Sequence, residues 1–95
     1  MKTEAQLQRY LRDEARRIGG TFDKLESRSR RGFPDCLILH KRVCWFVELK
    51  APTGKGALSK LQRVVIADLR KHGANVLIID SKQGVDDFIN AVAGS

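Results

Sequence analysis

Apolar and polar positions near the start of the chain repeat with the period of an α-helix. The apolar positions expected on one helical face are Leu7, Leu11, Ala15 and Ile18. Thr3 is suited to cap the start of this helix, and Gly19 and Gly20 are suited to end it. The pattern predicts an amphipathic helix over residues 3–18.

A second helical pattern follows residue 59. Its apolar positions are Leu61, Val64, Val65 and Leu69. Ser59 and Gln62 have the spacing of a capping box, and Gly73 suits the left-handed position that follows a helix. A short closing helix is expected over residues 85–92.

Four segments outside these helices are expected to be strands. The two clearest, residues 35–40 and 43–50, are rich in β-branched and aromatic side chains. Residues 75–80 contain an unbroken apolar run, which is typical of a buried strand. Residues 21–28 form a weaker candidate, with Phe22 and Leu25 as its clear apolar anchors.

The predicted order of elements is α-β-β-β-α-β-α, which defines an α/β domain. The strand, helix and strand between Val43 and Ile79 form a βαβ unit, so its crossover should be right-handed and its two strands parallel. The two clear strands are expected to form an antiparallel hairpin. The fold class is therefore a mixed central sheet flanked by helices on both faces.

Charged residues stand at the ends of the two clear strands, where apolar residues would be expected. Asp35 follows Pro34 at the start of the first strand, and Glu48 and Lys50 close the second. Carboxylates within apolar strands are costly to desolvate unless a metal or a cation compensates them. This arrangement predicts a site for a divalent cation beside a phosphate.

The hairpin register decides whether the two carboxylates meet. If the turn lies at Lys41-Arg42, His40 faces Val43 and Asp35 lands opposite Glu48, with Cβ atoms roughly 5 Å apart. Glu48 and Lys50, two residues apart, share one face of the sheet. Neither turn residue suits the positive φ of a tight two-residue turn, and a slip of one residue would move Asp35 to the other face.

The bulk properties indicate one basic globular domain. The chain has 95 residues, of which 42% are apolar and 31% charged, and Lys plus Arg number 18 against 11 acids, a net charge of +7. This excess favours a polyanionic partner, nucleic acid first, although basic charge that serves solubility alone is an alternative.

No apolar stretch is long enough to span a membrane, and we expect an intracellular protein of a bacterium or a phage-infected cell. We interpret Cys36 and Cys44 as core thiols rather than metal or redox residues.

Four motifs in this order resemble the VRR-NUC family of the PD-(D/E)xK nuclease superfamily. They are Gly32-x-Pro34-Asp35, Phe46-Val47-Glu48-Leu49-Lys50-x-Pro52, Leu58-Ser59-x-x-Gln62 and Gly73-Ala74-x-Val76. Glu-x-Lys alone is a weak signal, whereas the ordered set is specific. The resemblance covers residues 1–95 as a single domain and implies a restriction-endonuclease-like core.

The resemblance also implies a role for each motif residue. Asp35 and Glu48, with the carbonyl of Leu49 as a further ligand, would bind Mg²⁺ or Mn²⁺, since hard oxygen ligands suit both ions. Lys50 would orient the nucleophile and offset developing charge. Gln62 would hold the substrate or the water network, although it is equally suited to serve only as the capping partner of Ser59.

The family also carries an acidic residue on its first helix. Glu4 and Glu14 both lie near the apolar face of this helix, so periodicity does not separate them. The family pattern favours Glu4 as a further metal ligand and catalytic residue. The alternative for Glu4 is simple complementation of the helix dipole.

Several basic residues flank the predicted site in sequence. They are Arg28, Arg30, Arg31, Lys55, Lys60 and Arg63. We predict that they contact DNA phosphates, which position a nucleic acid without reading its sequence. A solvated charged surface is the alternative for each of them.

The combined prediction is a metal-dependent endonuclease that hydrolyses DNA phosphodiester bonds. The family likeness to archaeal Holliday junction resolvases implies a homodimer that selects branched DNA, such as Holliday junctions, in DNA repair. One alternative is a catalytically inert DNA-binding module on the same fold. Another is a small nucleotide- or phosphate-binding protein, favoured only by the loop at residues 54–56.

Overall fold

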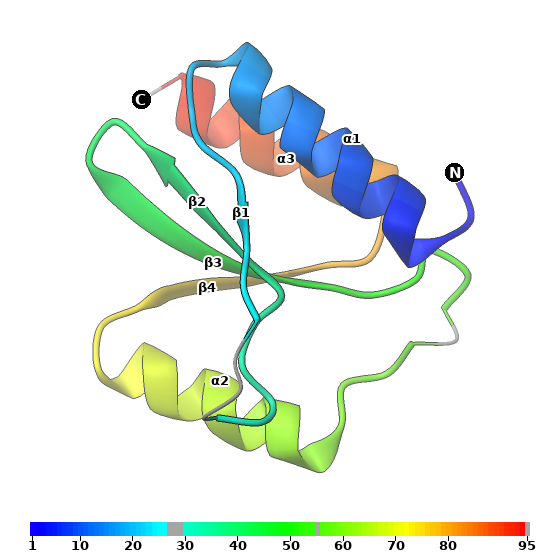
Figure 1. Ribbon diagram of the computed structural model, residues 1–95, viewed down its shortest axis with the longest axis vertical. Coiled ribbons are helices and arrows are strands. Elements are labelled where there is room, and N and C mark those ends of the chain that lie inside the picture. The colour runs from blue at the N-terminus through cyan, green and yellow to red at the C-terminus, as the bar shows by residue number, and fades with distance from the viewer. Residues whose placement is uncertain (27–29, 55, 95) are drawn as a thin grey trace.

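The structure, a computed structural model, describes residues 1–26, 30–54 and 56–94 (Figure 1). Its elements in chain order are α1 (Glu4–Arg17), β1 (Asp23–Lys24), β2 (Cys36–His40), β3 (Val43–Leu49), α2 (Lys60–Lys71), β4 (Asn75–Ile79) and α3 (Lys82–Ala93). The strands form one sheet in the order β1-β2-β3-β4. Pairing is antiparallel from β1 to β3 and parallel between β3 and β4. The predicted order and the mixed sheet are confirmed.

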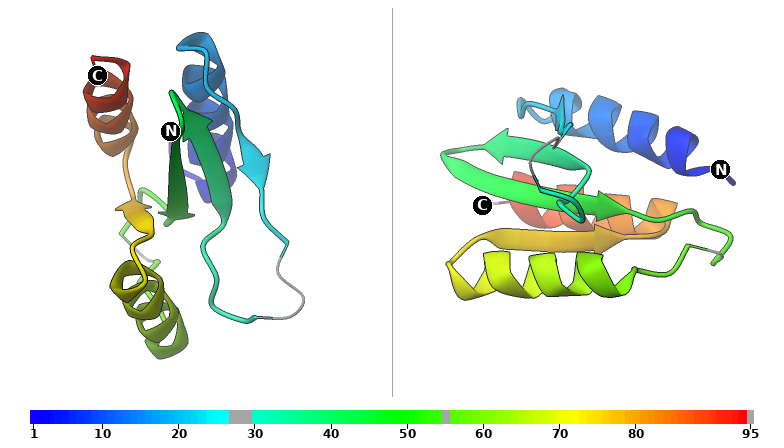
Figure 2. Two further views of the ribbon diagram at one scale, coloured as in Figure 1. Left: turned by 90° about the vertical axis from the view of Figure 1, so that its left-hand side faces the viewer. Right: turned by 60° about the horizontal axis from the view of Figure 1, so that its bottom comes forward.

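The helices lie in two layers, one on each side of the sheet (Figures 1 and 2). α1 and α3 pack together over one face, and α2 covers the other face near β4. Four sheet side chains that face α1 and α3 are wholly buried, namely Cys36, Ile38, Val47 and Leu49. The opposite face is only partly covered, because α2 lies beside β4, and Leu39 on that face stays 46% exposed.

Side-chain caps fix the helix starts. Thr3 and Ser59 both form complete capping boxes, the latter with Gln62 as predicted. α3 begins three residues earlier than expected, because the side chain of Ser81 caps it by accepting a hydrogen bond from the amide of Gly84. The apolar pattern alone did not show this start, since its first turn is polar.

The hairpin has the predicted register. Cys36 pairs with Val47 and His40 pairs with Val43. Lys41 and Arg42 both adopt positive φ angles, 47° and 69°, although neither residue type favours them. The strand pairing on both sides of the turn imposes this conformation, at a cost of roughly 1–2 kcal/mol per residue.

Two strand predictions need correction. β1 spans only Asp23–Lys24 rather than residues 21–28, and Arg28 lies outside the described residues. β4 is an edge strand rather than a fully buried one, so Ile78 is 41% exposed. The apolar run gave no sign of this, because the position of a strand within a sheet depends on its partners.

Candidate active site

The hairpin brings the two predicted carboxylates to one end of β2 and β3. Because Cys36 pairs with Val47, Asp35 and Glu48 are the next residues on the two strands, one residue beyond the last β2–β3 pair. The Asp35 carboxylate is fixed by the amide of Leu49, which donates to Asp35 Oδ2 at 2.8 Å. The Leu49 amide therefore holds the site together, and a metal-binding role for its carbonyl stays a prediction.

Glu48, Lys50 and Gln62 form a triangle of short contacts. Lys50 Nζ lies 3.2 Å from Glu48 Oε2 and donates to Gln62 Oε1 at 3.0 Å. Gln62 Nε2 donates to the same Glu48 oxygen at 2.7 Å. Gln62 Oε1 also accepts from the amide of Ser59, so Gln62 caps α2 and contacts Glu48 at the same time. The capping role of Gln62 is confirmed, and its role in holding the substrate or the water network stays a prediction.

Glu48 is the unusual group of this site. Its side chain is 1% exposed, and its Oε1 atom is buried without a hydrogen-bond partner among the described residues. Burial raises the pKa of Glu48 from its usual 4.5 to about 7, and the nearby Asp35 carboxylate raises it further, while Lys50 opposes the shift. A buried acceptor beside a second carboxylate is suited to a cation.

The donor set fits a small hard cation. Asp35 and Glu48 offer carboxylate oxygens, and Glu48 Oε1 has no competing protein donor in the described part of the chain. Mg²⁺ is commonly held by one or two carboxylates together with waters and substrate phosphates. Across residues 1–26, 30–54 and 56–94, no group of three or more Asp, Glu, His or Cys side chains comes together. The two carboxylates that the structure brings together are therefore those of Asp35 and Glu48.

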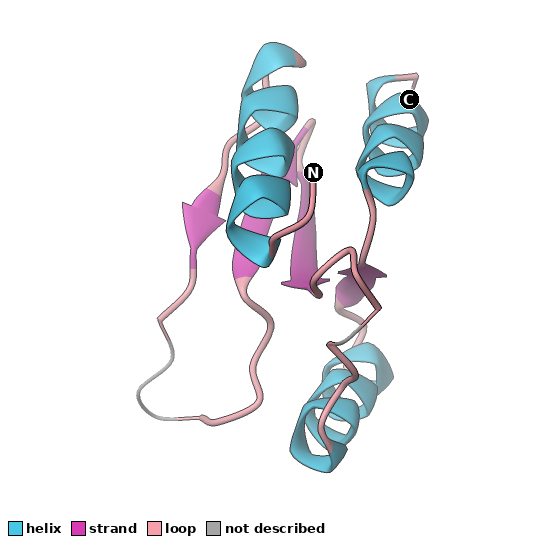
Figure 3. Ribbon diagram, turned by 90° about the vertical axis from the view of Figure 1, so that its right-hand side faces the viewer, coloured by secondary structure: helices cyan, strands magenta, loops and turns pink. Residues whose placement is uncertain are grey.

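The helix-borne acid is not drawn into this pair. Glu14 forms an ion pair with Arg17 on its own helix, at 2.8 Å. Glu4 is exposed at the start of α1. The start of α1 lies on the same side of the molecule as the end of β3 (Figures 1 and 3). Position thus favours Glu4 over Glu14, but its role as a metal ligand stays a prediction.

The predicted DNA-contacting residues fall into three groups. Arg31, Lys60 and Arg63 are exposed. Arg30 forms an ion pair with Asp68 of α2, which ties the segment before Asp35 to that helix. Arg28 and Lys55 lie outside the described residues. Their DNA contacts stay predictions.

Sequence patterns missed the aromatic support of the Asp35 segment. Phe33 packs edge-on against Phe46 of β3, with ring centroids 5.5 Å apart and planes at 88°. Because Phe33 stands two residues before Asp35, this contact positions the chain that carries the carboxylate. Its position beside Pro34-Asp35 was the only sequence signal.

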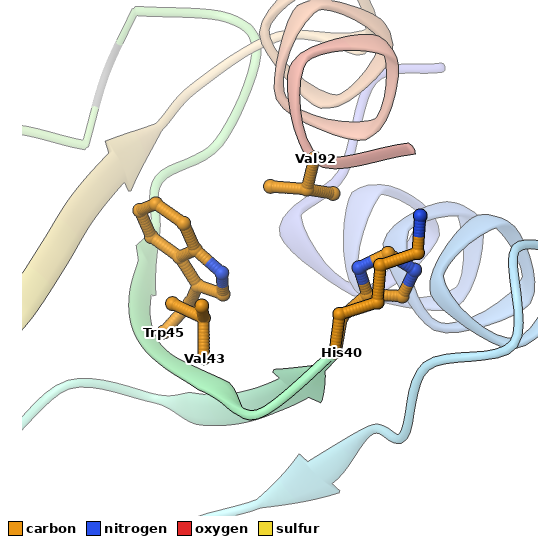
Figure 4. A pocket seen from close by; sticks show the side chains of 5 residues that line it. His40, Val43, Trp45 and Val92 are labelled. Carbon is orange, nitrogen blue, oxygen red and sulfur yellow. The ribbon is translucent and has the colours of Figure 1, made fainter. Parts of the chain in front are cut away.

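Two hollows of the surface lie away from the carboxylates. One of about 170 Å³ lies at the turn end of the hairpin, lined by His40, Lys41, Val43, Trp45 and Val92 (Figure 4). A larger groove of about 400 Å³ runs beside β4 and α3 and includes Trp45, Leu77, Ile78 and Phe88. Neither is lined by the carboxylates, so neither is the candidate active site.

Both cysteines are free thiols in the interior or near it. Cys36 is fully buried, and burial raises the pKa of its thiol to about 12, with the Asp35 and Glu48 charges adding to the shift. A thiol of such high pKa is a poor nucleophile and a poor metal ligand. Cys36 thus behaves as a core residue.

The chain is similar to known proteins over almost its whole length. No family model matches the chain. The chain is 38% identical over 90 residues to "Putative nuclease p44" of Acyrthosiphon pisum secondary endosymbiont phage 1, covering 94% of each chain. It is 33% identical to a solved structure described as "VRR_NUC domain", covering 95% of this chain and 97% of that one with a TM-score of 0.85.

The mixed sheet and its flanking helices define an α/β domain with the fold of the VRR_NUC structure. The chain belongs to the VRR-NUC family. Its described helices include none long and apolar enough to cross a membrane.

Proposed function

We propose that this protein is a metal-dependent endonuclease that hydrolyses DNA phosphodiester bonds. The observation that supports this most is the buried Oε1 atom of Glu48, which has no protein partner in the described residues and lies beside the Asp35 carboxylate. An unsatisfied buried oxygen is costly and is usually retained for a purpose.

Asp35 and Glu48 would hold the cation, Mg²⁺ or Mn²⁺. When bound, such a cation neutralises charge on the phosphate and makes water more acidic. The Leu49 amide holds the Asp35 side chain in place. Gln62 and Lys50 both engage Glu48 Oε2, which leaves Oε1 for the cation.

Lys50 is placed to act on the phosphate. Its ammonium group is largely buried, with 16% of the side chain exposed, and it lies against both Glu48 and Gln62. A fixed positive charge in a partly dry site stabilises negative charge that develops on phosphate oxygens. We assign Lys50 to charge stabilisation and to orientation of the attacking water.

The direct test is a cleavage assay with four labelled DNAs of one sequence: a four-way junction, a linear duplex, a single strand and a flap. Each is incubated with Mg²⁺, Mn²⁺ or a chelator, using the parent protein and Asp35→Asn. We expect cleavage that requires the cation and is lost in the variant. Binding of DNA without any cleavage would overturn the proposal in favour of an inert DNA-binding module.

We also propose that the protein selects branched DNA and acts as a homodimer. The open edge of β4 and the apolar groove beside it support a second copy as the partner, because exposed sheet edges and apolar grooves favour association. Two sites in one dimer would allow two strands of a junction to be cut. Light scattering should give twice the 10.7 kDa of one chain.

Ala91 lines the groove and is exposed, so Ala91→Glu tests this interface. We expect the variant to be monomeric with an unchanged circular dichroism spectrum. A parent protein that is monomeric at micromolar concentration would contradict the homodimer. It would leave the nuclease proposal intact.

A further inference from the structure

The helix that carries Gln62 also exposes two apolar side chains. Leu61 is 46% exposed and Val64 is 57% exposed, the highest value among the large apolar residues of the described chain. They are three residues apart on α2, so they form one ridge on its outer side. Single exposed apolar residues are ordinary, but this ridge has an unusual position.

The ridge borders the candidate active site on two sides. Gln62, the neighbour of Leu61, contacts both Glu48 and Lys50. Gly32 has a φ of 83°, and a Cβ atom placed on it would lie 2.9 Å from Leu61 Cγ. Leu61 therefore packs against the segment that reaches Asp35 three residues later.

Basic residues surround this ridge. Lys60 and Arg63, which precede Leu61 and Val64 in sequence, are both exposed, and so is Arg31 of the adjoining segment. An apolar protein partner would have to desolvate these charges, whereas a nucleic acid would pair its phosphates with them. Gln62 contacts Lys50, so a phosphate that reaches Lys50 would lie near the start of α2.

We propose that Leu61 and Val64 contact an unstacked base beside the cleaved phosphate and thereby select DNA whose stacking is interrupted. This inference rests on the proposed nuclease function. In a continuous duplex the faces of the bases are covered by their neighbours, and an apolar side chain gains contact only by separating a base step. At a branch, flap or mismatch the bases are already partly unstacked, so the same contact costs less.

The test compares Val64→Ser, and the double variant Leu61→Ser with Val64→Ser, with the parent protein. Val43→Ser is the matched control, because Val43 is 39% exposed at the turn end of the hairpin, away from the carboxylates. The first measurement is the ratio of cleavage rates for a four-way junction and a linear duplex of the same sequence. We expect Val64→Ser to lower this ratio and the double variant to lower it by about tenfold, mainly through slower junction cleavage.

The second measurement does not depend on cleavage. A junction with 2-aminopurine at the branch is bound in the presence of chelator, and its fluorescence reports unstacking of that base. We expect the parent and Val43→Ser to increase the fluorescence and both ridge variants to give a smaller increase. Leu61 packs on the Gly32 segment, so Val64→Ser alone decides the matter if the double variant fails to fold.

Two outcomes would overturn the inference. One is a parent-like rate ratio together with parent-like fluorescence in Val64→Ser. The other is an equal loss of affinity for junction and duplex, which would make the ridge a general contact. A parent protein that cuts no DNA with either cation would instead reject the proposed nuclease, while the fluorescence experiment would still judge the ridge.

Discussion

The two halves of β3 each contain a buried polar atom without a hydrogen-bond partner in the described chain, and they differ in what surrounds it. Glu48 Oε1 lies among groups that carry charge, namely Asp35 and Lys50, with Gln62 fixing the second oxygen. Trp45 Nε1 lies nearer the turn, where the ring packs against Phe88 at 5.5 Å and lines an apolar hollow with Val92 (Figure 4).

The charged surroundings of Glu48 support an active-site role, whereas the surroundings of Trp45 support a role in packing. An ionisable acceptor held between a second carboxylate and an ammonium group has a charge state that a cation can change. The indole N–H of Trp45 carries no charge, and in a hollow also lined by His40, Lys41, Val43 and Val92 it needs only a water molecule or a partner's acceptor. A buried atom without a hydrogen-bond partner is therefore interpreted from the charges around it.

Substitutions of Glu48 and Trp45, one in each half of β3, should affect DNA cleavage very differently. Glu48→Gln keeps the shape of the side chain but removes its charge, so we expect DNA cleavage to fall by about 10³-fold or more. Lys50→Ala should cause a similar loss through the missing positive charge. Trp45→Phe removes the indole N–H together with part of the ring, far from the carboxylates, and should retain most of the activity.

The measurement is the single-turnover cleavage rate with Mg²⁺, with DNA binding followed separately by anisotropy. Both active-site variants should still bind DNA and keep their circular dichroism spectra. Parent-like cleavage by Glu48→Gln would remove Glu48 from the mechanism. An equal loss in Trp45→Phe would erase the distinction between the two halves of the strand.

Much of this comparison could be predicted from the sequence. The apolar periods and caps gave the element order, and the hairpin register followed from placing the turn at Lys41-Arg42, which put Asp35 and Glu48 together. The sequence predicted the capping contact of Gln62 but not its contact with Glu48, because the capping pattern does not show where the amide nitrogen points. The missing partners of Glu48 Oε1 and Trp45 Nε1 depend on three-dimensional packing, so no local pattern could indicate them.

The edge position of β4 could not be predicted from the sequence for a similar reason. Its apolar residues are typical of a central strand, yet its outer side has no neighbouring strand in the described sheet. Part of the apolar surface of β4 lines the groove beside α3 and is not covered by helix α2. An apolar strand with one open edge can pair with a further strand, which supports the proposed interface between two copies.

The stability of the two halves should respond differently to pH. Folding raises the pKa of Glu48 from 4.5 to about 7, so the folded state holds this proton more tightly than the unfolded chain. The favourable contribution of the protonated group is complete below pH 4.5 and is lost as the pH rises through about 7. Glu48→Gln should therefore stabilise the metal-free protein by about 1–3 kcal/mol at pH 8, and much less at pH 4.5.

Urea unfolding at both pH values, in chelator, measures this effect. Trp45→Phe is the control, because its effect on the free energy of unfolding should be the same at both pH values. Adding Mg²⁺ at pH 8 should stabilise the parent and not Glu48→Gln, since binding to the folded state alone raises stability. A pH-independent effect of Glu48→Gln would show that burial does not perturb its ionisation.

The smallest expected effect concerns the basic residues before Asp35. Arg31 is exposed, whereas Arg30 is paired with Asp68 on α2, so the two arginines should differ although they are adjacent. Each phosphate contact that is lost lowers the slope of log affinity against log salt by about 0.9 for duplex DNA. Arg31→Ala should reduce the slope by about 1 with little change in stability.

Arg30→Ala should instead loosen the segment that carries Asp35 and lower the cleavage rate more than the slope. Equal slopes for both variants and the parent would assign the two arginines to a solvated surface, and the charge that attracts DNA would then have to come from α2, through Lys60 and Arg63.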